Sequence, residues 1–311
     1  MAKTRQIRKR IGSVRNIHKI TRTMERVAQS KGMKLTGRFA SAKTYRLDLQ
    51  RLLPEALGAA TDSLEATQEL SQQPLGMHRA QVRHVLLFCI TSSRGLCDGY
   101  NAKVIQATRA RMEALRTDGK EPVLAVMGKK GLAYFRYHNQ PVAISIPDTD
   151  ENMPYQRMDE IATQVMSLFT SAGVDAVELI STCARTKVVQ EVRRVEVLPF
   201  TTTFFAQAAD SKKPAPSPAV GPDGQAVYLV EPTREPVLAA LLPLLFKVEL
   251  FCAALEAMLC EQAQRTIAMR SASDNAQAMT QTLTRTYNRA RQAQITNEMI
   301  EIISGSEGGR T

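Results

Sequence analysis

Two glycine-containing loops are the places where this sequence could bind a phosphate group. One reads SSRGLCDGYN and contains Gly95 and Gly99, and the other reads MGKKG, with Gly128 and Gly131 on either side of two lysines. Backbone N–H groups at the start of a helix can hold an anion, but neither loop has the G-x-G-x-x-G or G-K-[ST] pattern of a nucleotide site. Because glycine is also common at strand-to-helix turns for geometric reasons, we favour a structural role for both loops.

The histidines and cysteines show no spacing typical of a metal site or of an activated nucleophile. No H-E-x-x-H and no G-x-S-x-G sequence is present, and an odd number of cysteines without a C-x-x-C pair argues against disulfides and against zinc. The sequence therefore nominates no catalytic residue, no cofactor and no metal, and an enzyme with its own active site is the weaker class of function. The residues considered are His18, His78, His84, His138, Cys89, Cys97, Cys183, Cys252 and Cys260.

The positive charge of the chain is concentrated at one end. The formal net charge is +11 at pH 7, yet residues 1–46 alone hold fourteen Lys or Arg and a single acid, Glu25, for a local charge of +13. Such a segment attracts a negative partner, which could be nucleic acid, anionic lipid or an acidic protein surface. A solvated helix face is the simpler alternative.

The N-terminal residues 1–75 are expected to form a long helix, because their apolar residues recur every three or four positions. Gly32 and Gly37 leave open whether this is one helix or two. The apolar stripe is expected to continue after residue 31 from Leu35 to Ala56, through Tyr45 and Leu52. Its first half is expected to consist of Ile7, Ile11, Val14, Ile17, Ile20, Met24 and Val27.

The C-terminal residues 237–304 are expected to form a second long helix, followed by a tail over 305–311. Residues 244–304 contain neither glycine nor proline, and a ladder of alternating three- and four-residue steps runs from Leu245 to Ala290. Its mean step of 3.5 is the coiled-coil period. Because the ladder includes polar positions such as Ser273, we expect the two terminal helices to pair through small and polar contacts as well as apolar ones.

Between the terminal helices, residues 80–230 are expected to form a doubly wound α/β domain, with a Pro-rich loop over 206–224. Short apolar runs that alternate with helical stretches are typical of a parallel sheet covered on both faces. Expected helices cover 102–117 and 156–172. Expected strands are Val85 to Ile90, Val123 to Met127, Val142 to Ile146 and Ala176 to Ile180, with further strands at Val188 to Phe200 and Val227 to Val230.

Three strings of residues closely resemble the gamma subunits of F-type ATP synthases. They are IRKRIGSVRNIHKITRTMERVAQSK (Ile7 to Lys31), RGLCDGYN (Arg94 to Asn101), and MRSASDNA with the later YNRARQAQITNEMIEIISG (Met269 to Gly305). Their order and spacing and the length of the chain also match, so the resemblance covers nearly the whole sequence. The chain departs from the common pattern at Asp98, where the family usually has glycine, and in its unusually apolar segment 241–260.

The resemblance implies a rotating central shaft, made of a long antiparallel coiled coil of the terminal helices with a Rossmann-like α/β domain at its base. It implies that the shaft turns inside a ring of alpha and beta subunits, whose beta subunits carry the catalytic nucleotide sites. It also implies that the foot binds the epsilon subunit and the membrane c-ring. The chain would then be a non-catalytic, peripheral protein on the cytoplasmic face of the cell membrane, attached only through the complex.

The resemblance also assigns contact residues. Arg291 and Gln292, with Thr296 and Glu298 one turn further on, match the family's polar contact with the beta subunits, and Met24 lies in the region that faces beta. From the residues alone, Arg291 could equally be a solvated charge, and Met24 is better explained as a coiled-coil seam residue. The apolar tip from Met299 to Ile303 would turn within an apolar sleeve.

Other readings of the same features remain open at this stage. A basic coiled-coil protein could bind nucleic acid through residues 1–46, although only Phe39 and Tyr45 are available there to stack on bases. A small-molecule enzyme could use the α/β domain, with the helices as oligomerisation arms. A gamma-like paralogue from a second rotary ATPase would share the matching strings. We favour the shaft, with no nucleic acid as partner.

Overall fold

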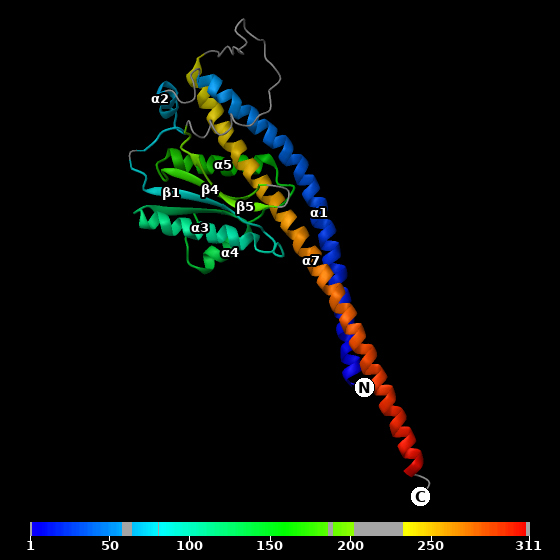
Figure 1. Ribbon diagram of the computed structural model, residues 1–311. Coiled ribbons are helices and arrows are strands. Elements are labelled where there is room, and N and C mark those ends of the chain that lie inside the picture. Colours follow the sequence, from blue (N-terminus) through cyan, green and yellow to red (C-terminus); the bar gives the residue numbers. More distant parts are fainter. Residues whose placement is uncertain (1, 58–63, 80, 186–188, 202–232, 309–311) are drawn as a thin grey trace. The chain divides into compact units, whose positions relative to one another are not determined.

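The computed structural model describes residues 2–57, 64–79, 81–185, 189–201 and 233–308. The chain divides into two compact units, which are described separately below. Unit 1 contains residues 1–30 and 263–311, and unit 2 contains residues 31–262. Helix α1 (Ala2–Leu57) and helix α7 (Arg234–Gly308) each contribute residues to both units (Figure 1).

The N-terminal helix is shorter than expected but unbroken, and the C-terminal helix is longer than expected. Helix α1 is unbroken through Gly32 and Gly37, and the remainder of the expected 1–75 helix is a separate short helix, α2 (Leu64–Gln72). Helix α7 passes through Pro243 and continues to Gly308, so the backbone of the expected tail is helical as far as that residue. The expected strand at 227–230 and the Pro-rich loop at 206–224 lie outside the described residues.

Unit 2 is built around a five-stranded sheet with the strand order β3-β2-β1-β4-β5. Strands β1 to β4 pair in parallel and β5 pairs with β4 in antiparallel fashion. This confirms the expected α/β sheet, and the expected half-exposed strand at 188–200 is observed over 190–198 as its antiparallel edge. The strands are β1 (His84–Ile90), β2 (Glu121–Met127), β3 (Ile144–Ile146), β4 (Ala176–Ala184) and β5 (Gln190–Leu198).

Helices cover both faces of the sheet (Figure 1). Helices α3 (Tyr100–Thr117) and α4 (Lys129–Tyr137) pack on the face to which Leu87 of β1 points. Helix α5 (Tyr155–Thr170) packs on the opposite face, to which Phe88 points, together with parts of α1 and α7. Successive residues of β1 thus enter different cores, because side chains alternate across a strand. Helix α4 was not expected from the sequence.

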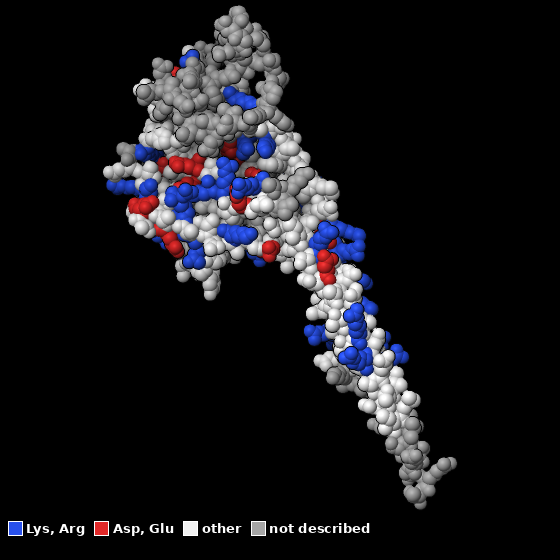
Figure 2. All heavy atoms as spheres, in the orientation of Figure 1, with Lys and Arg blue, Asp and Glu red and all other residues white. Residues whose placement is uncertain are grey.

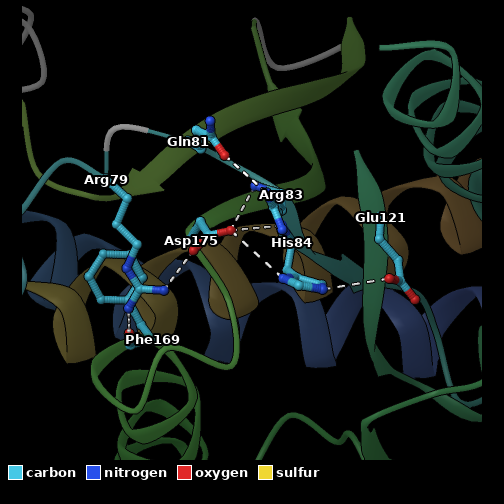
Figure 3. A network of polar contacts seen from close by, with 7 residues as sticks. All are labelled: Arg79, Gln81, Arg83, His84, Glu121, Phe169 and Asp175. Carbon is cyan, nitrogen blue, oxygen red and sulfur yellow. Dashed lines mark hydrogen bonds and ion pairs between the residues drawn. The ribbon is translucent and has the colours of Figure 1, made fainter. Parts of the chain in front are cut away.

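A buried aspartate fastens the start of β1 to the rest of the sheet (Figure 3). Asp175 is 7% exposed and accepts hydrogen bonds from the guanidinium of Arg79 at 2.6 Å and from the backbone N–H groups of Arg83 and His84 at 2.7 and 2.8 Å. Although burial alone raises the pKa of a carboxyl group, these hydrogen bonds hold the pKa of Asp175 below its ordinary value. We call this network the staple: the carboxylate of Asp175 holds the start of β1 in place, and its negative charge is balanced by the guanidinium of Arg79.

Within unit 2 the seam between α1 and α7 is rich in leucine. Tyr45 and Leu52, which were expected in this seam, are instead 49% and 40% exposed, because the helix buries Leu49 and Leu53. The predicted ladder on α7 is confirmed here. The buried seam residues of the two helices include Leu35, Leu49, Leu53, Ala56, Leu245, Val248, Cys252 and Leu255.

One charged residue interrupts this leucine-rich seam. The carboxylate of Glu249 is buried, accepts a hydrogen bond from the amide of Gln50 and lies 3.3 Å from a guanidinium nitrogen of Arg46. Burial raises the pKa of Glu249, although Arg46 and Gln50 act in the opposite direction. The network ties α1 to α7 at one polar point within an apolar contact.

Helix α1 also holds the loop that leads from β3 to α5. The guanidinium of Arg38 donates hydrogen bonds to the main-chain carbonyls of Glu151 and Met153, the second at 2.6 Å. The ammonium of Lys31 lies 2.5 Å from the Glu151 carboxylate, and the Arg38 guanidinium lies 5.9 Å from the ring centre of Phe251 on α7. This group of contacts, the Arg38 clamp, joins α1, the loop and α7 within unit 2.

Helix α7 is long and apolar enough to cross a membrane by length and composition alone. Within Arg234–Ile300 its most apolar 18-residue window has a mean hydropathy of 2.1, and 56% of that window is buried inside the protein. A core helix of a soluble protein has the same properties. Since Leu245 and Phe246 are 0% and 1% exposed, the apolar segment is accounted for by packing within unit 2.

Candidate functional site

In the loop MGKKG, backbone N–H groups at the start of helix α4 are hydrogen-bonded within the protein. The backbone N–H of Lys130 donates to the carbonyl of Ser92 at 3.1 Å, and the N–H of Gly131 donates to the hydroxyl of Thr91 at 3.0 Å. A Cβ at Gly128 would lie 2.2 Å from the Thr91 carbonyl oxygen, and one at Gly131 would lie 2.6 Å from the Thr91 hydroxyl. The glycines are thus needed for close packing, and these N–H groups are not free to bind a phosphate.

The loop RGLCDGYN anchors the α/β domain to α7 within unit 2. The buried hydroxyl of Tyr100 donates to the carbonyl of Ala257 at 3.1 Å, and Tyr100 packs with Cys97 and Cys260. Asp98 has a φ of 51°, a left-handed conformation that glycine adopts freely and that aspartate tolerates better than most residues. The departure from the usual glycine therefore preserves the shape of the loop.

The described residues do not form a recognisable reaction centre. Among them no group of three or more His, Cys, Asp or Glu side chains is placed to hold a metal ion. Burial raises the pKa of Cys89 to about 12, partly offset by a hydrogen bond with Thr108, so this thiol is not activated as a nucleophile. The surfaces that distinguish the chain lie instead on the paired terminal helices.

In unit 1 the terminal helices pair in antiparallel fashion, and the predicted ladder on α7 is again confirmed. The hydroxyl of Thr4 lies 2.7 Å from the amide oxygen of Gln294, which places the start of α1 beside the C-terminal part of α7. Ser273 and Ala276 of the ladder are 5% and 7% exposed. Small and polar residues thus fill this part of the seam, as expected.

The predicted seam of α1 in unit 1 is wrong beyond Val14. The helix buries Thr21 and Ala28 instead, at 8% and 1% exposure. The predicted seam takes three successive steps of three residues from Ile11 to Ile20. Because a helix turns by about 100° per residue, each such step falls about 60° short of a full turn and moves the predicted positions away from the partner helix. Alternating steps of four and three keep the seam on one face. The apolar residues thereby left outside are Ile17 (52% exposed), Ile20 (57%), Met24 (40%) and Val27 (48%).

We call these four residues of α1 the exposed apolar stripe. Their own spacing of three, four and three places them on one face of the helix. Lysine and arginine side chains gather along the paired helices of unit 1, with few acids on the face drawn in Figure 2. Residues 1–30 contain nine Lys or Arg and the single acid Glu25. The stripe is therefore an apolar surface within a strongly basic one.

The four residues assigned near the C-terminus are all exposed on α7. The hydroxyl of Thr296 donates to the carbonyl of Gln292 at 3.0 Å, and the Glu298 carboxylate accepts from the amide of Gln294 at 2.8 Å. No ion pair joins Arg291 to the side chains that the structure describes. Arg291 and Gln292 are thus available to a partner, whereas Thr296 and Glu298 already have contacts on their own helix.

Met24 does not lie with these four residues. Thr4 pairs with Gln294 and Met24 is twenty residues further along α1, so the two sites are about 30 Å apart at about 1.5 Å per residue. Beyond Gln294 every described side chain of α7 is exposed, including Met299 at 57%. The candidate site therefore consists of two separate patches, and the sequence missed Ile17, Ile20 and Val27, which accompany Met24.

Comparisons with known proteins agree with the fold and with the motifs. A family model described as ATP synthase matches residues 3–308. The ATP synthase gamma chain of Leptospira biflexa is 33% identical over 307 residues, covering 99% of both chains, and that of Nocardia farcinica is 34% identical over 324 residues, covering 98% of this chain and 97% of the other.

Solved structures share the fold. A chain in the cryo-EM structure of the Euglena gracilis mitochondrial ATP synthase (OSCP/F1/c-ring) aligns with a TM-score of 0.64 at 19% identity, over 99% of this chain and 94% of that one. A chain of the central stalk and c-ring of the Tetrahymena thermophila enzyme aligns with a TM-score of 0.55 at 23% identity, over 82% and 99%.

The class of protein is thus a non-catalytic subunit of an ATP synthase, built from two long paired helices and an α/β domain. More particularly, this chain belongs to the ATP synthase gamma chain family, which forms the central stalk of F-type ATP synthases.

Proposed function

We propose that the paired terminal helices act as the rotating shaft of an F-type ATP synthase and couple ion flow through a membrane c-ring to nucleotide chemistry on a ring of alpha and beta subunits. The relatives are ATP synthase gamma chains that align over 97% or more of their length. Of the aligned structures, one is named for F1 and the c-ring and the other for the central stalk and the c-ring. Coupling requires the shaft to interact differently with different conformations of the ring. A helix face that differs in polarity from the rest of the shaft meets that requirement, because it can favour one ring conformation over another.

The exposed apolar stripe carries this proposal. An isolated coiled coil gains nothing by exposing Ile17, Ile20, Met24 and Val27 while it buries Thr21 in the seam, because burial of apolar surface is the favourable arrangement. Exposed apolar residues in a row mark an interaction surface. The surrounding positive charge favours a partner surface that is apolar at its centre and acidic around it.

Further partners are part of the same proposal. We assign the binding of the epsilon subunit and of the c-ring to unit 2. The complex would lie on the cytoplasmic face of the cell membrane, and the chain would be attached to the membrane only through its partners. The chain could serve either a main ATP synthase or a second rotary ATPase of the same type. Purifying the native complex and identifying the subunits that accompany the chain tests whether the epsilon subunit and the c-ring are its partners. The sequences of those subunits also tell which of the two ATPases the chain serves.

The stripe is tested by replacing Ile20 and Met24 together with serine. We expect assembly with alpha and beta subunits to weaken at least tenfold, and ATP-driven ion pumping in membrane vesicles to fall with it, because two exposed apolar contacts are lost. The matched control is Met77→Ser, since Met77 is a comparably exposed methionine (50%) in unit 2. Equal assembly of the double variant and the control would reject the stripe as a ring contact.

The second patch is tested by Arg291→Ala combined with Gln292→Ala. The complex should still assemble, but the rate of ATP hydrolysis or its coupling to ion flow should fall several-fold, because polar contacts made in only some ring conformations are lost. Arg289→Ala removes an exposed charge from the same part of α7 and serves as the control. Unchanged coupled synthesis in the double variant would remove these residues from the site.

A further inference from the structure

Two hollows lie side by side between helices α3 and α4 of unit 2. The smaller has a volume of about 180 Å³ and is lined by Arg109, Met112, Glu113, Arg116, Tyr134, Phe135, His138 and Gln140. The larger, of about 710 Å³, is lined by Asn101, Ala102, Ile105, Gln106, Arg109, Ala110, Glu113, Lys130 and Tyr134. The larger hollow includes Asn101 and Lys130, one residue from each of the loops considered above, whereas the smaller hollow includes no residue of either loop, and the terminal helices line neither hollow.

Two arginines of the smaller hollow are held in place by neutral partners. The guanidinium of Arg109 donates to the hydroxyl of Tyr134 at 3.1 Å, and that of Arg116 donates to the amide oxygen of Gln140 at 3.0 Å. The first bond runs from α3 to α4, and the second runs from α3 to Gln140, three residues after the end of α4. A guanidinium has five N–H donors, so these contacts orient both groups while leaving donors for a ligand.

A third arginine on the same helix shows the opposite arrangement. Arg111 points toward the sheet and forms a bidentate ion pair with the buried carboxylate of Glu178, at 2.8 and 2.5 Å. The only acid at the hollows, Glu113, lies 3.8 Å from Arg109 with its side chain 69% exposed. Arg111 is therefore neutralised, whereas Arg109, Arg116 and Lys130 leave an excess of positive charge at the hollows.

The interior of the smaller hollow is apolar and aromatic. Its floor is formed by Met112 and Phe135, which are 4% and 0% exposed. The ring of Tyr134 meets the ring of Phe135 edge-on, with centroids 5.5 Å apart, and lies 4.4 Å from the imidazole of His138. An anion here would be flanked by the exposed guanidinium groups of Arg109 and Arg116 above an apolar floor, and hydrogen bonds from ionised donors are stronger than those between neutral groups.

The bond between Arg109 and Tyr134 excludes one class of occupant. It crosses from α3 to α4 at the boundary of the two hollows, since both residues line both of them. A partner helix could not lie along the groove without breaking this bridge. A small molecule can occupy a hollow on each side and pass over the bridge between them.

We propose that the paired hollows bind a nucleoside phosphate. The phosphate groups would take the smaller hollow, where Arg109 and Arg116 can each hold phosphate oxygens in bidentate fashion. The base would lie in the larger hollow, against the side chain of Ile105 and the ring of Tyr134. The amide of Gln106, which can both donate and accept, is placed to contact the edge of the base.

The test is calorimetric titration of the purified full-length chain with ATP, followed by Arg109→Gln combined with Arg116→Gln. The wild-type chain should bind ATP, and the double variant should bind at least tenfold more weakly. Arg136→Gln is the control, because Arg136 is exposed on α4 but lines neither hollow, and its affinity should stay within twofold of wild type. Circular dichroism should show all three chains equally folded.

Competition with pyrophosphate and with adenosine separates the two parts of the ligand. Both should displace ATP, and each should bind more weakly than ATP does. The proposal is overturned if the wild-type chain shows no binding at millimolar ATP, or if the double variant binds as well as wild type. It is equally overturned if pyrophosphate binds as tightly as ATP, since the hollows would then hold a simple anion.

Discussion

The seam between α1 and α7 is rich in leucine in unit 2 and polar in unit 1, although the same two helices form both. In unit 2 it buries Leu53 and Leu255 completely, whereas in unit 1 it buries Thr21 and Ser273. The heptad ladder on α7 continues without interruption through the two units. The period of the seam is therefore constant, and only its chemistry changes.

This difference shows where the stability of the chain is concentrated. Apolar burial contributes about 25 cal/mol per Å², and the leucine seam of unit 2 also closes one face of the sheet. In unit 1 the hydroxyl of Thr21 returns to its own helix, to the carbonyls of Ile17 and His18, whereas the hydroxyl of Thr4 reaches Gln294 on the other helix. Such polar contacts bury less apolar surface than leucine does. Unit 1 should accordingly open more readily than unit 2.

The largest effect is expected from Leu53→Ala. Leu53 is fully buried in unit 2, so the substitution should lower the free energy of unfolding by about 3 kcal/mol through lost burial and the cavity left behind. Urea denaturation followed by circular dichroism measures the change. Its neighbour Leu52 is 40% exposed, and Leu52→Ala should cost less than about 1 kcal/mol; equal losses would mean that the seam of unit 2 is not the main source of stability.

The next largest effect is expected from Asp175→Asn, which breaks the staple at β1 and should cost about 3 kcal/mol at pH 7 by leaving the guanidinium of Arg79 without its ion pair. Because the folded-state pKa of Asp175 is lowered, its contribution is present above the ordinary value of 3.8 and is lost as the pH falls through the folded pKa. The gap between wild type and variant should thus narrow below about pH 4.

Asp148→Asn is the control for the staple. Asp148 lies 2.7 Å from Lys129, but its side chain is 82% exposed, and exposed ion pairs contribute about 0 to 1 kcal/mol. Denaturation curves at pH 7 and at pH 4 should hardly change. A pH-independent gap between wild type and Asp175→Asn would show that the aspartate acts by shape and not by charge.

The smallest effect is expected from Thr21→Val in unit 1. The substitution keeps the shape of the side chain and replaces a hydroxyl bonded only to its own helix by a methyl group in the seam, for a gain of about 0.5 kcal/mol. Amide hydrogen exchange of residues 14–28 should slow about twofold. Thr23 makes the same bond to its own helix but is exposed, so Thr23→Val should leave exchange unchanged; slower exchange in both would reflect helix propensity alone.

Much of the fold is readable from the sequence, because period and apolar runs are local properties. The strands at 85–90 and 176–180 and the ladder from Leu245 were predicted at nearly their observed positions. Helix α4 was missed because it begins directly after Gly128 and contains Gly131, a poor helix former. Its place is dictated by contact with Thr91, forty residues earlier, and no local pattern reports that contact.

The candidate site was predicted less completely than the fold. Arg291 and Gln292 were assigned by resemblance, and the structure adds that both are exposed. The sequence placed Met24 in the seam, because over residues 15–28 the large apolar side chains of α1 share its face, whereas the face that is buried carries Thr21 and Ala28. The α7 side of the seam in unit 1 has the same character, since it buries the small residues Ser273 and Ala276.

The Arg38 clamp has a consequence for how this chain can change over generations. The guanidinium grips two main-chain carbonyls, at Glu151 and Met153, and every amino acid carries such a carbonyl. Substitutions in the loop therefore leave these two hydrogen bonds in place. Arg38 itself cannot be replaced in the same way, because lysine lacks the planar guanidinium that spans both oxygens. The hydrogen bonds of the clamp should therefore restrict sequence change at 38 and not at 151 or 153, where separate contacts act: Glu151 pairs with Lys31, and the side chain of Met153 is buried in the core.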